Sequence, residues 1–181
     1  MTLMQRRRAL MGAQRASLPP IYLYDNGVIS EFAGGIDNSG LTKNPNFNTV
    51  TQTANFLKYT CTSSSSASSV KGGRAFTFKN PLPASCIGRK IYVRFSHKNA
   101  SSTATDALQI RVAPTVVTAG DVSAAYPDSI YANNSCFQES DFVERIASLT
   151  ISKTGYVSIP AYKWGSGGGT YEFRVYEVWI E

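Results

Sequence analysis

Three stretches of the chain alternate apolar and polar residues with a period of two, which restricts most of it to β-sheet. They are "RKIYVRFS" at 89–96, "ALQIRV" at 107–112 and "TYEFRVYEVWIE" at 170–181. Successive side chains of a strand point to opposite faces, so each stretch buries one face and turns the other outward. The predicted inward residues are Ile91, Val93, Phe95, Leu108, Ile110, Val112, Tyr171, Phe173 and Val175. The alternation becomes irregular at Tyr176, which indicates a β-bulge or burial on both faces.

Shorter segments between turn signals bring the expected total to roughly eight to ten strands. These segments lie at 21–24 before the turn Asp25-Asn26-Gly27, at 28–32, at 55–60, at 74–78, and at 148–152 and 156–160, the last two forming a hairpin with Gly155 at its turn. Residues 36–54 are expected to be loop, and Asp141–Glu144 to cap a short helical turn. The predicted fold class is all-β: an antiparallel, jelly-roll-like sandwich, with a flattened barrel as the alternative.

The first 20 residues differ in composition from the rest. They hold four arginines and no acidic residue, Arg6, Arg7, Arg8 and Arg15, and so carry four of the six net positive charges. Four apolar residues recur at helical spacing, namely Leu3, Met4, Leu10 and Met11. Pro19 and Pro20 end this pattern, because proline cannot continue a helix. We expect a short helical arm at 1–20 and a β-sandwich domain at 21–181.

Several roles for this arm are open. Its apolar run after Arg8 is too short for a secretory signal, whereas its lack of acidic residues also suits an organelle transit peptide. A frayed, solvated tail is the plainest alternative. A helix of about three turns is marginal in water by itself, so a persistent arm needs a partner: its own domain, sister copies or another protein. No apolar run approaches the roughly 20 residues of a membrane span, so no membrane partner is expected.

The sequence contains no recognisable catalytic or metal-binding pattern. His97 is the one histidine and is expected to be a solvated turn residue, and no serine-nucleophile elbow or framed carboxylate pair occurs. Asp37-Asn-Ser-Gly40 resembles a fragment of a calcium loop but lacks the other ligands. The three cysteines, Cys61, Cys86 and Cys136, include no CxxC pair and are expected to be buried thiols. We therefore predict no enzyme activity, no metal and no cofactor.

No nucleic-acid partner is expected either, since residues 21–181 carry a net charge of only +2. A carbohydrate is the ligand that the aromatic residues suit best. Tyr162 and Trp164 precede a glycine-rich loop that could close over a sugar ring. Outward Tyr92, Arg94, Gln109 and Arg111 would form one polar–aromatic face if their strands are neighbours. Alternatively, Trp164 plugs the end of the core, and the other residues form an ordinary exposed face or a subunit interface.

The segments "RRRALM", "IYLYDNG", "EFAGG" and "YEFRVYEVWIE" resemble those of small virion structural proteins of tailed bacteriophages, of the tail, baseplate or particle-decorating kind. This resemblance implies a jelly-roll domain similar to carbohydrate-binding modules, facing outward from the particle. It also implies that the arm docks on other virion proteins, that the chain forms a homo-oligomer, a trimer being favoured, and that it is assembled into virions in the cytoplasm of a bacterial host.

The leading hypothesis is therefore a virion structural protein that docks through Leu3, Met4, Arg6, Arg7, Arg8, Leu10, Met11 and Arg15. Its sandwich would bind host-surface glycan through Tyr162, Trp164, Tyr92, Arg94 and Arg111. One alternative is a purely architectural capsid or tail decoration protein without a ligand. A second alternative is a cellular carbohydrate-binding module.

Overall fold

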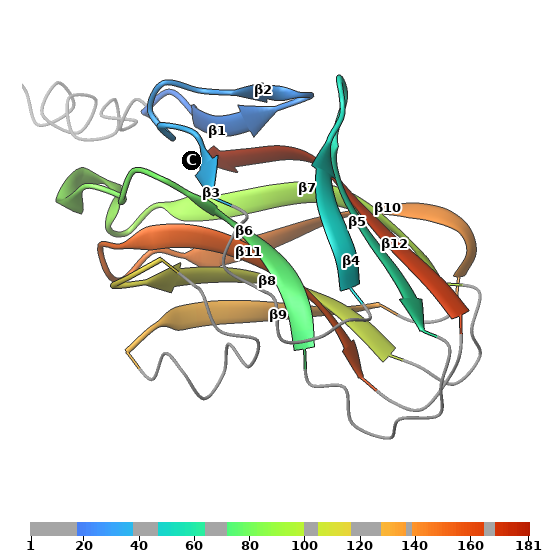
Figure 1. Cartoon of the computed structure of the whole chain (residues 1–181). Coiled ribbons are helices and arrows are strands. Elements are labelled where there is room, and N and C mark those ends of the chain that lie inside the picture. The colour runs from blue at the N-terminus through green and yellow to red at the C-terminus, as the bar shows by residue number, and fades with distance from the viewer. Residues whose placement is uncertain are drawn as a thin grey trace, which may run out of the picture.

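The computed structural model describes residues 18–37, 47–63, 72–99, 105–116, 128–136, 139–164 and 169–181. These residues form twelve β-strands and one three-residue 3-10 helix, Ala84–Cys86 (Figure 1). Of the helical arm expected at 1–20, residues 1–17 lie outside the described residues, and residues 18–20 are not helical. Within the part described, no helix is long and apolar enough to span a bilayer.

Seven strands form one antiparallel sheet. They are β1 (Ile21–Asp25), β2 (Val28–Ile29), β4 (Phe47–Gln52), β5 (Leu57–Ser63), β7 (Lys90–Asn99), β10 (Glu139–Thr150) and β12 (Gly169–Ile180). The order is β10-β7-β12-β1-β2, and β12 also pairs with β5, which pairs with β4. The long strand β12 thus has β7 on one side and β5 followed by β1 on the other.

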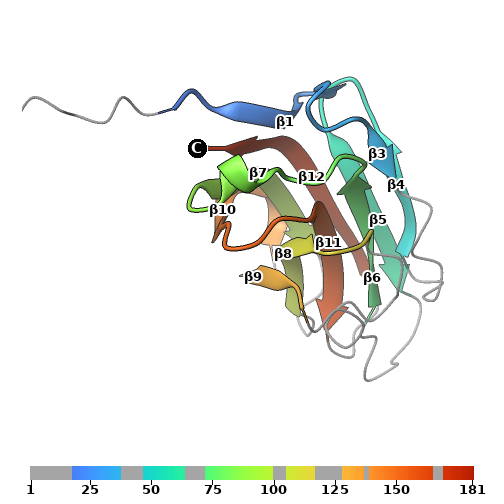
Figure 2. The ribbon, with the colours of Figure 1, turned by 90° about the vertical axis from the view of Figure 1, so that its left-hand side faces the viewer.

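The other five strands form a second antiparallel sheet in the order β3-β6-β11-β8-β9. They are β3 (Ile36–Asp37), β6 (Gly72–Phe78), β8 (Thr105–Ala113), β9 (Ile130–Cys136) and β11 (Tyr156–Trp164). The two sheets pack as a sandwich, and Figure 2 shows β1 running alongside β12 next to the C-terminus. The all-β sandwich predicted from the alternation is confirmed.

The core lies between the sheets and contains the residues that the alternation predicted. All nine predicted inward residues of β7, β8 and β12 are at most 1% exposed. Tyr59 of β5 spans this core, because its hydroxyl donates a hydrogen bond to the carbonyl of Ile159 in the opposite sheet. Burial raises the pKa of Tyr59 well above its usual range, so the phenol stays a donor at physiological pH. This bond gives the two sheets a fixed polar contact within the core.

Strand β12 contains the irregularity expected at Tyr176. Its register against β7 shifts between Val175 and Glu177, which makes Tyr176 the extra residue of a β-bulge. The carbonyl of Tyr176 accepts a hydrogen bond of 2.8 Å from the backbone N–H of Asn26, in the turn between β1 and β2. The bulge lies where the partner of β12 changes from β5 to β1.

The turn predicted at Asp25-Asn26-Gly27 is confirmed, with positive φ angles of 42° at Asn26 and 97° at Gly27. Three other local predictions are wrong. Only Val28–Ile29 of the segment 28–32 is strand, because the chain turns at Glu31–Gly34. The expected loop 36–54 includes β3 and β4, and the expected helical turn at 141–144 lies within β10.

The predicted hairpin around Gly155 is also wrong. Strand β10 pairs with β7 in one sheet, whereas β11 pairs with β6 and β8 in the other, so the chain crosses between sheets after Thr150. Gly155 has φ 146°, and its carbonyl accepts a hydrogen bond of 2.7 Å from Leu82. A β-carbon there would lie 2.3 Å from the carbonyl oxygen of Ala113, so the crossing requires glycine.

His97 is a buried residue of β7 and not the solvated turn residue that was predicted. Its Nδ1 lies 3.0 Å from Oε2 of Glu139, and its ring centre lies 4.5 Å from that of Phe173. Glu139 also pairs with Arg145, six residues further along β10. Burial pushes the pKa of Glu139 upward, but the hydrogen bonds from Arg145 and His97 outweigh it. The net result is a pKa below the ordinary value of 4.5.

Replacing Glu139 by glutamine is expected to reduce the fall in melting temperature that occurs as the pH is lowered. A carboxyl whose pKa is lowered by folding adds stability above its unfolded pKa and loses it as pH falls through its folded pKa. Wild type should therefore exceed Glu139→Gln in melting temperature at pH 7, and the gap should narrow below about pH 5. Melting curves across pH measure this, with Glu31→Gln, an exposed turn carboxyl, as control. A constant gap down to pH 3 would contradict the prediction.

Deleting residues 1–17 is expected to leave cooperative unfolding intact. All strand pairings of the described residues begin at Ile21 or later, and the nearest N-terminal anchor is the hydrogen bond from Arg89 to the carbonyl of Pro19, 2.9 Å long. Circular dichroism and melting of the shortened chain provide the check. Loss of the β-sheet signal would show that the sandwich needs its first residues.

The expectation of buried thiols holds for two of the three cysteines. Cys86 and Cys136 are buried, while the side chain of Cys61 lies outside the described residues. Burial raises the pKa of the Cys86 thiol, which keeps it protonated and weakly nucleophilic.

Candidate functional site

Three aromatic side chains form a row across the outer face of the seven-stranded sheet. Tyr22 of β1 pairs with Trp179 of β12, which pairs with Tyr92 of β7. The ring centres of Trp179 and Tyr92 are 5.2 Å apart with planes inclined by 16°, and those of Trp179 and Tyr22 are 6.5 Å apart with an inclination of 28°. We call these three residues the aromatic row.

The strand alternation explains why the aromatic row faces outward. Its members alternate with buried residues of the same strands, namely Leu23, Ile91, Val93, Val178 and Ile180. Tyr22 is 42% exposed, and Tyr92 and Trp179 are half-buried. Strand β2 pairs with β1 only at Tyr24 and Asp25, so it does not cover the side of Tyr22 away from Trp179. The row is therefore a nearly parallel set of rings with access from solvent.

A charged network borders the aromatic row along β7 and β12. Arg94 lies 3.0 Å from Glu177 and 3.2 Å from Glu144, and it also donates to the side-chain oxygen of Asn26 over 3.3 Å. Hydrogen bonding to Glu177 raises the pKa of Arg94 above its usual value. The guanidinium also covers the ring of Tyr176 at 4.9 Å. These groups hold fixed donors and acceptors beside the rings.

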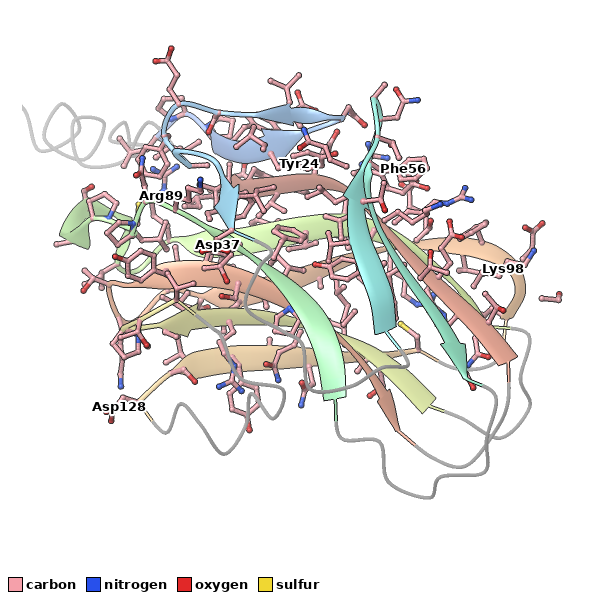
Figure 3. All side chains as sticks on the ribbon, viewed as in Figure 1. Tyr24, Asp37, Phe56, Arg89, Lys98 and Asp128 are labelled. Carbon is pink, nitrogen blue, oxygen red and sulfur yellow. The ribbon has the colours of Figure 1, made fainter. Side chains whose placement is uncertain are left out.

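Further along the same face, an arginine lies close to two phenylalanine rings. The guanidinium carbon of Arg174 lies 3.6 Å from the ring centre of Phe142 and 4.9 Å from that of Phe56. Its Nε donates to Glu172 over 2.6 Å. We call Arg174, Phe142 and Phe56 the arginine–phenylalanine cluster. Figure 3 labels Phe56, just before β5, and Lys98, near the end of β7.

The predicted carbohydrate-binding residues fall on two different sheets. Tyr92 and Arg94 lie on the outer face of the seven-stranded sheet, whereas Arg111, Tyr162 and Trp164 belong to the five-stranded sheet. Because β7 and β8 are not neighbours, the single face predicted from Tyr92, Arg94, Gln109 and Arg111 does not form. Only Tyr92 and Arg94 join the aromatic row and its charged border.

Arg111 is fully buried and not open to solvent as the outward pattern suggested. Its Nε donates to Gln109 over 2.9 Å and its Nη1 to Ser129 over 2.6 Å. The guanidinium also lies 4.8 Å from the ring centre of Tyr131. These contacts give Arg111 a structural role on β8, since buried arginine requires hydrogen-bond partners.

Tyr162 and Trp164 lie at the end of β11, where Tyr162 pairs with Gly73 and Ala107, and Trp164 pairs with Thr105. Trp164 is therefore a strand residue and not part of an open loop. The side chains of both residues, and the glycine-rich segment 165–168, lie outside the described residues. So do the docking residues proposed for the arm: Leu3, Met4, Arg6, Arg7, Arg8, Leu10, Met11 and Arg15.

The sequence alone did not single out Tyr22, Trp179 or the arginine–phenylalanine cluster. Tyr22 alternates with the buried Leu23, so its exposure follows the strand pattern. Trp179 has the parity of the inward residues of β12, and it faces outward because the bulge at Tyr176 shifts the alternation. The exposure of Trp179, unlike that of Tyr22, was therefore not predictable from the pattern. Their contact depends on the register of β1 against β12, which joins segments more than 150 residues apart. Among the described residues, no group of three or more histidine, cysteine or acidic side chains could hold a metal ion.

The sequence matches no protein-family model and no curated protein. Solved structures with a similar arrangement of strands include carbohydrate-binding modules. A variant of CBM29-2 has 11% identity and a TM-score of 0.47, over 91% of this chain and 92% of that one. CBM29_1 from Piromyces equi has 16% identity and a TM-score of 0.46, over 91% of each chain. A family 4 module, CBM4, has 12% identity and a TM-score of 0.43, over 78% and 90%.

Proposed function

We propose that this protein binds carbohydrate, without catalysis, through the outer face of its seven-stranded sheet. The observation that carries this proposal is the aromatic row of Tyr22, Trp179 and Tyr92. Solvent-accessible aromatic rings on three adjacent strands are costly to maintain unless something covers them, and sugar rings present apolar C–H faces that pack on such side chains. A rigid sheet also positions these rings better than a loop would.

The charged border supplies the hydrogen bonds that a sugar needs for orientation. Arg94, Glu177, Asn26 and Glu144 place donors and acceptors beside Tyr176 and the aromatic row. Hydroxyl groups of a sugar can both donate and accept, so they can bond to a guanidinium and a carboxylate at once. A shallow face of this kind binds weakly, with a dissociation constant near millimolar, or about −4 kcal/mol.

The two tryptophans of the chain allow the site to be located by fluorescence. In Trp164→Phe, Trp179 is the sole tryptophan, and in Trp179→Phe the sole one is Trp164. A panel of soluble oligosaccharides, neutral and charged, is titrated into each full-length variant. The proposal requires a saturable change in the emission of Trp179 with at least one glycan. If no member of the panel changes it and calorimetry shows no heat of binding, the protein does not act as a carbohydrate-binding module.

A second surface for glycan remains a proposal based on Tyr162 and Trp164 at the end of β11. The same titration distinguishes it, because a saturable change confined to Trp164 would place the ligand on the five-stranded sheet. Replacing Trp164 by alanine would then abolish binding without a large fall in melting temperature. A large fall would assign Trp164 to the core.

Attachment to a virion through residues 1–20 also remains a proposal, and it rests on the four arginines and the apolar spacing of that segment. Four cations without an acidic neighbour repel one another unless a partner neutralises them, and an exposed ion pair contributes only about 0–1 kcal/mol. The segment therefore favours a partner protein with an extended acidic surface. The trimeric state and the placement in a phage particle depend on the same proposal. Light scattering on the full chain and on the variant Arg6→Gln/Arg7→Gln/Arg8→Gln tests the trimer. If both are monomers at tens of micromolar, the arm does not drive trimer formation. The cellular carbohydrate-binding module needs none of these features.

A further inference from the structure

Among the described residues of the outer face, Arg174 is the one charged group that lies close to two aromatic rings. Its guanidinium stacks on Phe142 at 3.6 Å and lies 4.9 Å from Phe56, and its side chain is 30% exposed. Only its Nε has a hydrogen-bond acceptor among the described residues, which is Glu172. The two terminal nitrogens therefore keep donors available, in an orientation fixed by two rings and one carboxylate.

Two lysines flank this arginine on the neighbouring strands. Lys58 of β5 pairs directly with Arg174, and Lys98 of β7 pairs with Glu172. The Nζ of Lys98 also lies 5.6 Å from the ring centre of Phe142, so this one ring contacts both cations. Both lysine side chains are half-buried. The only carboxylate in this group is Glu172, so three cations face one anion.

This excess of positive charge is local. Arg94, by contrast, is balanced by Glu144 and Glu177 at 3.2 and 3.0 Å. Like charges on adjacent strands repel one another and destabilise a sheet. A bound anion would relieve this repulsion among Arg174, Lys58 and Lys98. A partly exposed guanidinium positioned by two rings suits a planar or tetrahedral anion, which can accept two parallel hydrogen bonds.

We propose that the glycan bound by this protein is anionic, and that its carboxylate or sulfate group is received by Arg174 with help from Lys98 and Lys58. This inference rests on the proposed function and specifies the class of ligand. Trp179 and Arg174 are five residues apart on β12, or about 16 Å along an extended strand, which a chain of several sugar rings can span. The aromatic row packs against the sugar rings while the cations bind the charged substituent.

The test compares anionic oligosaccharides with a neutral one. Tetragalacturonate carries carboxylates, its full methyl ester carries none, and sulfated maltotetraose carries sulfates in place of carboxylates. Binding is measured by calorimetry at low and moderate salt with the full-length chain. Arg6, Arg7 and Arg8 are replaced by glutamine throughout, because those cations would attract any polyanion. The variants are Arg174→Gln, Lys98→Gln and Lys58→Gln, with Lys79→Gln, an exposed lysine of the loop after β6, as the charge-matched control.

We expect at least one anionic ligand to bind about tenfold more tightly than the methyl ester, and Arg174→Gln to remove most of that preference. Lys98→Gln and Lys58→Gln should each have a smaller effect, and Lys79→Gln none. The inference would be overturned, and carbohydrate binding left intact, by a particular result with the methyl ester or another neutral glycan. In that result the glycan changes the emission of Trp179 equally in the parent chain of this test and in its Arg174→Gln variant. Equal losses in Arg174→Gln and Lys79→Gln would also overturn it, since they would indicate a diffuse charge effect. Absence of binding to every glycan would overturn both proposals. Melting curves show whether each variant is folded. If Arg174→Gln is not folded, the preference for anionic over neutral ligands is compared between Lys98→Gln and the parent chain instead.

Discussion

Replacing Trp179 by alanine is expected to reduce glycan affinity by about tenfold or more, and so below detection for a millimolar ligand. Trp179 is the middle member of the aromatic row and contacts both Tyr22 and Tyr92. Its removal therefore deletes the largest ring and also the contact that holds the other two parallel. Calorimetry with a glycan that binds wild type provides the measurement.

The matched control for this change is Tyr131→Ala. Tyr131 is likewise an exposed aromatic on a strand, but it belongs to the five-stranded sheet. Trp179 is half-buried on an outer face, so its loss should lower the melting temperature by no more than a few degrees. Unchanged affinity in Trp179→Ala, or an equal loss in Tyr131→Ala, would show that the aromatic row is not the binding surface.

Replacing Gly155 by alanine is expected to destabilise the fold by about 3 kcal/mol. Roughly 1–3 kcal/mol comes from a φ of 146°, which only glycine adopts without strain. The overlap of the new β-carbon with the carbonyl oxygen of Ala113, at 2.3 Å, adds about 1–3 kcal/mol, because both partners are backbone. The melting temperature should fall by about 6–12 °C for a domain of this size.

Gly88→Ala separates the two contributions. Gly88 also has a positive φ, 89°, but a β-carbon there would meet nothing within 4 Å. Its substitution should therefore cost only the strain, about 1–2 kcal/mol. If Gly155→Ala and Gly88→Ala lower the melting temperature equally, the crossing between the sheets is looser than the structure indicates.

The features predicted correctly from the sequence are those set by local periodicity. The alternation in 89–96, 107–112 and 170–181 identified strands, inward residues and the bulge at Tyr176, because side-chain direction within a strand depends only on position along it. The turn at Asn26-Gly27 was predictable for the same reason, since positive φ favours those two residues. Information of this kind is contained within a few consecutive residues.

The errors concern which elements meet. Gly155 has the positive φ angle that a glycine turn signal indicates, but the same signal serves a hairpin within one sheet and a crossing between two. Arg111 occupies an outward position of β8, yet it is buried, because the side chains of Gln109, Ser129 and Tyr131 contact its guanidinium. His97 is polar and was placed at the surface, whereas Glu139 and Phe173, from distant segments, provide partners that make its burial tolerable.

The candidate site was half predictable for the same physical reason. Tyr92 and Arg94 were selected as outward residues of one strand, and both belong to the outer face. Their most important neighbours, Trp179 and Glu177, are outward residues of another strand whose adjacency is decided by the topology. No property of either segment alone indicates that they share a face.

The position of β12 has a consequence for how the chain is made. This strand is the common partner of β1, β5 and β7, yet all three precede it along the chain. During synthesis from the N-terminus, the edges of β1, β5 and β7 that pair with β12 therefore stay unpaired until β12 is made. Because the contacts of β12 are long-range in sequence, we expect the seven-stranded sheet to form slowly. The period before β12 arrives is when these edges are exposed to aggregation or to binding by chaperones, however stable the finished sandwich is.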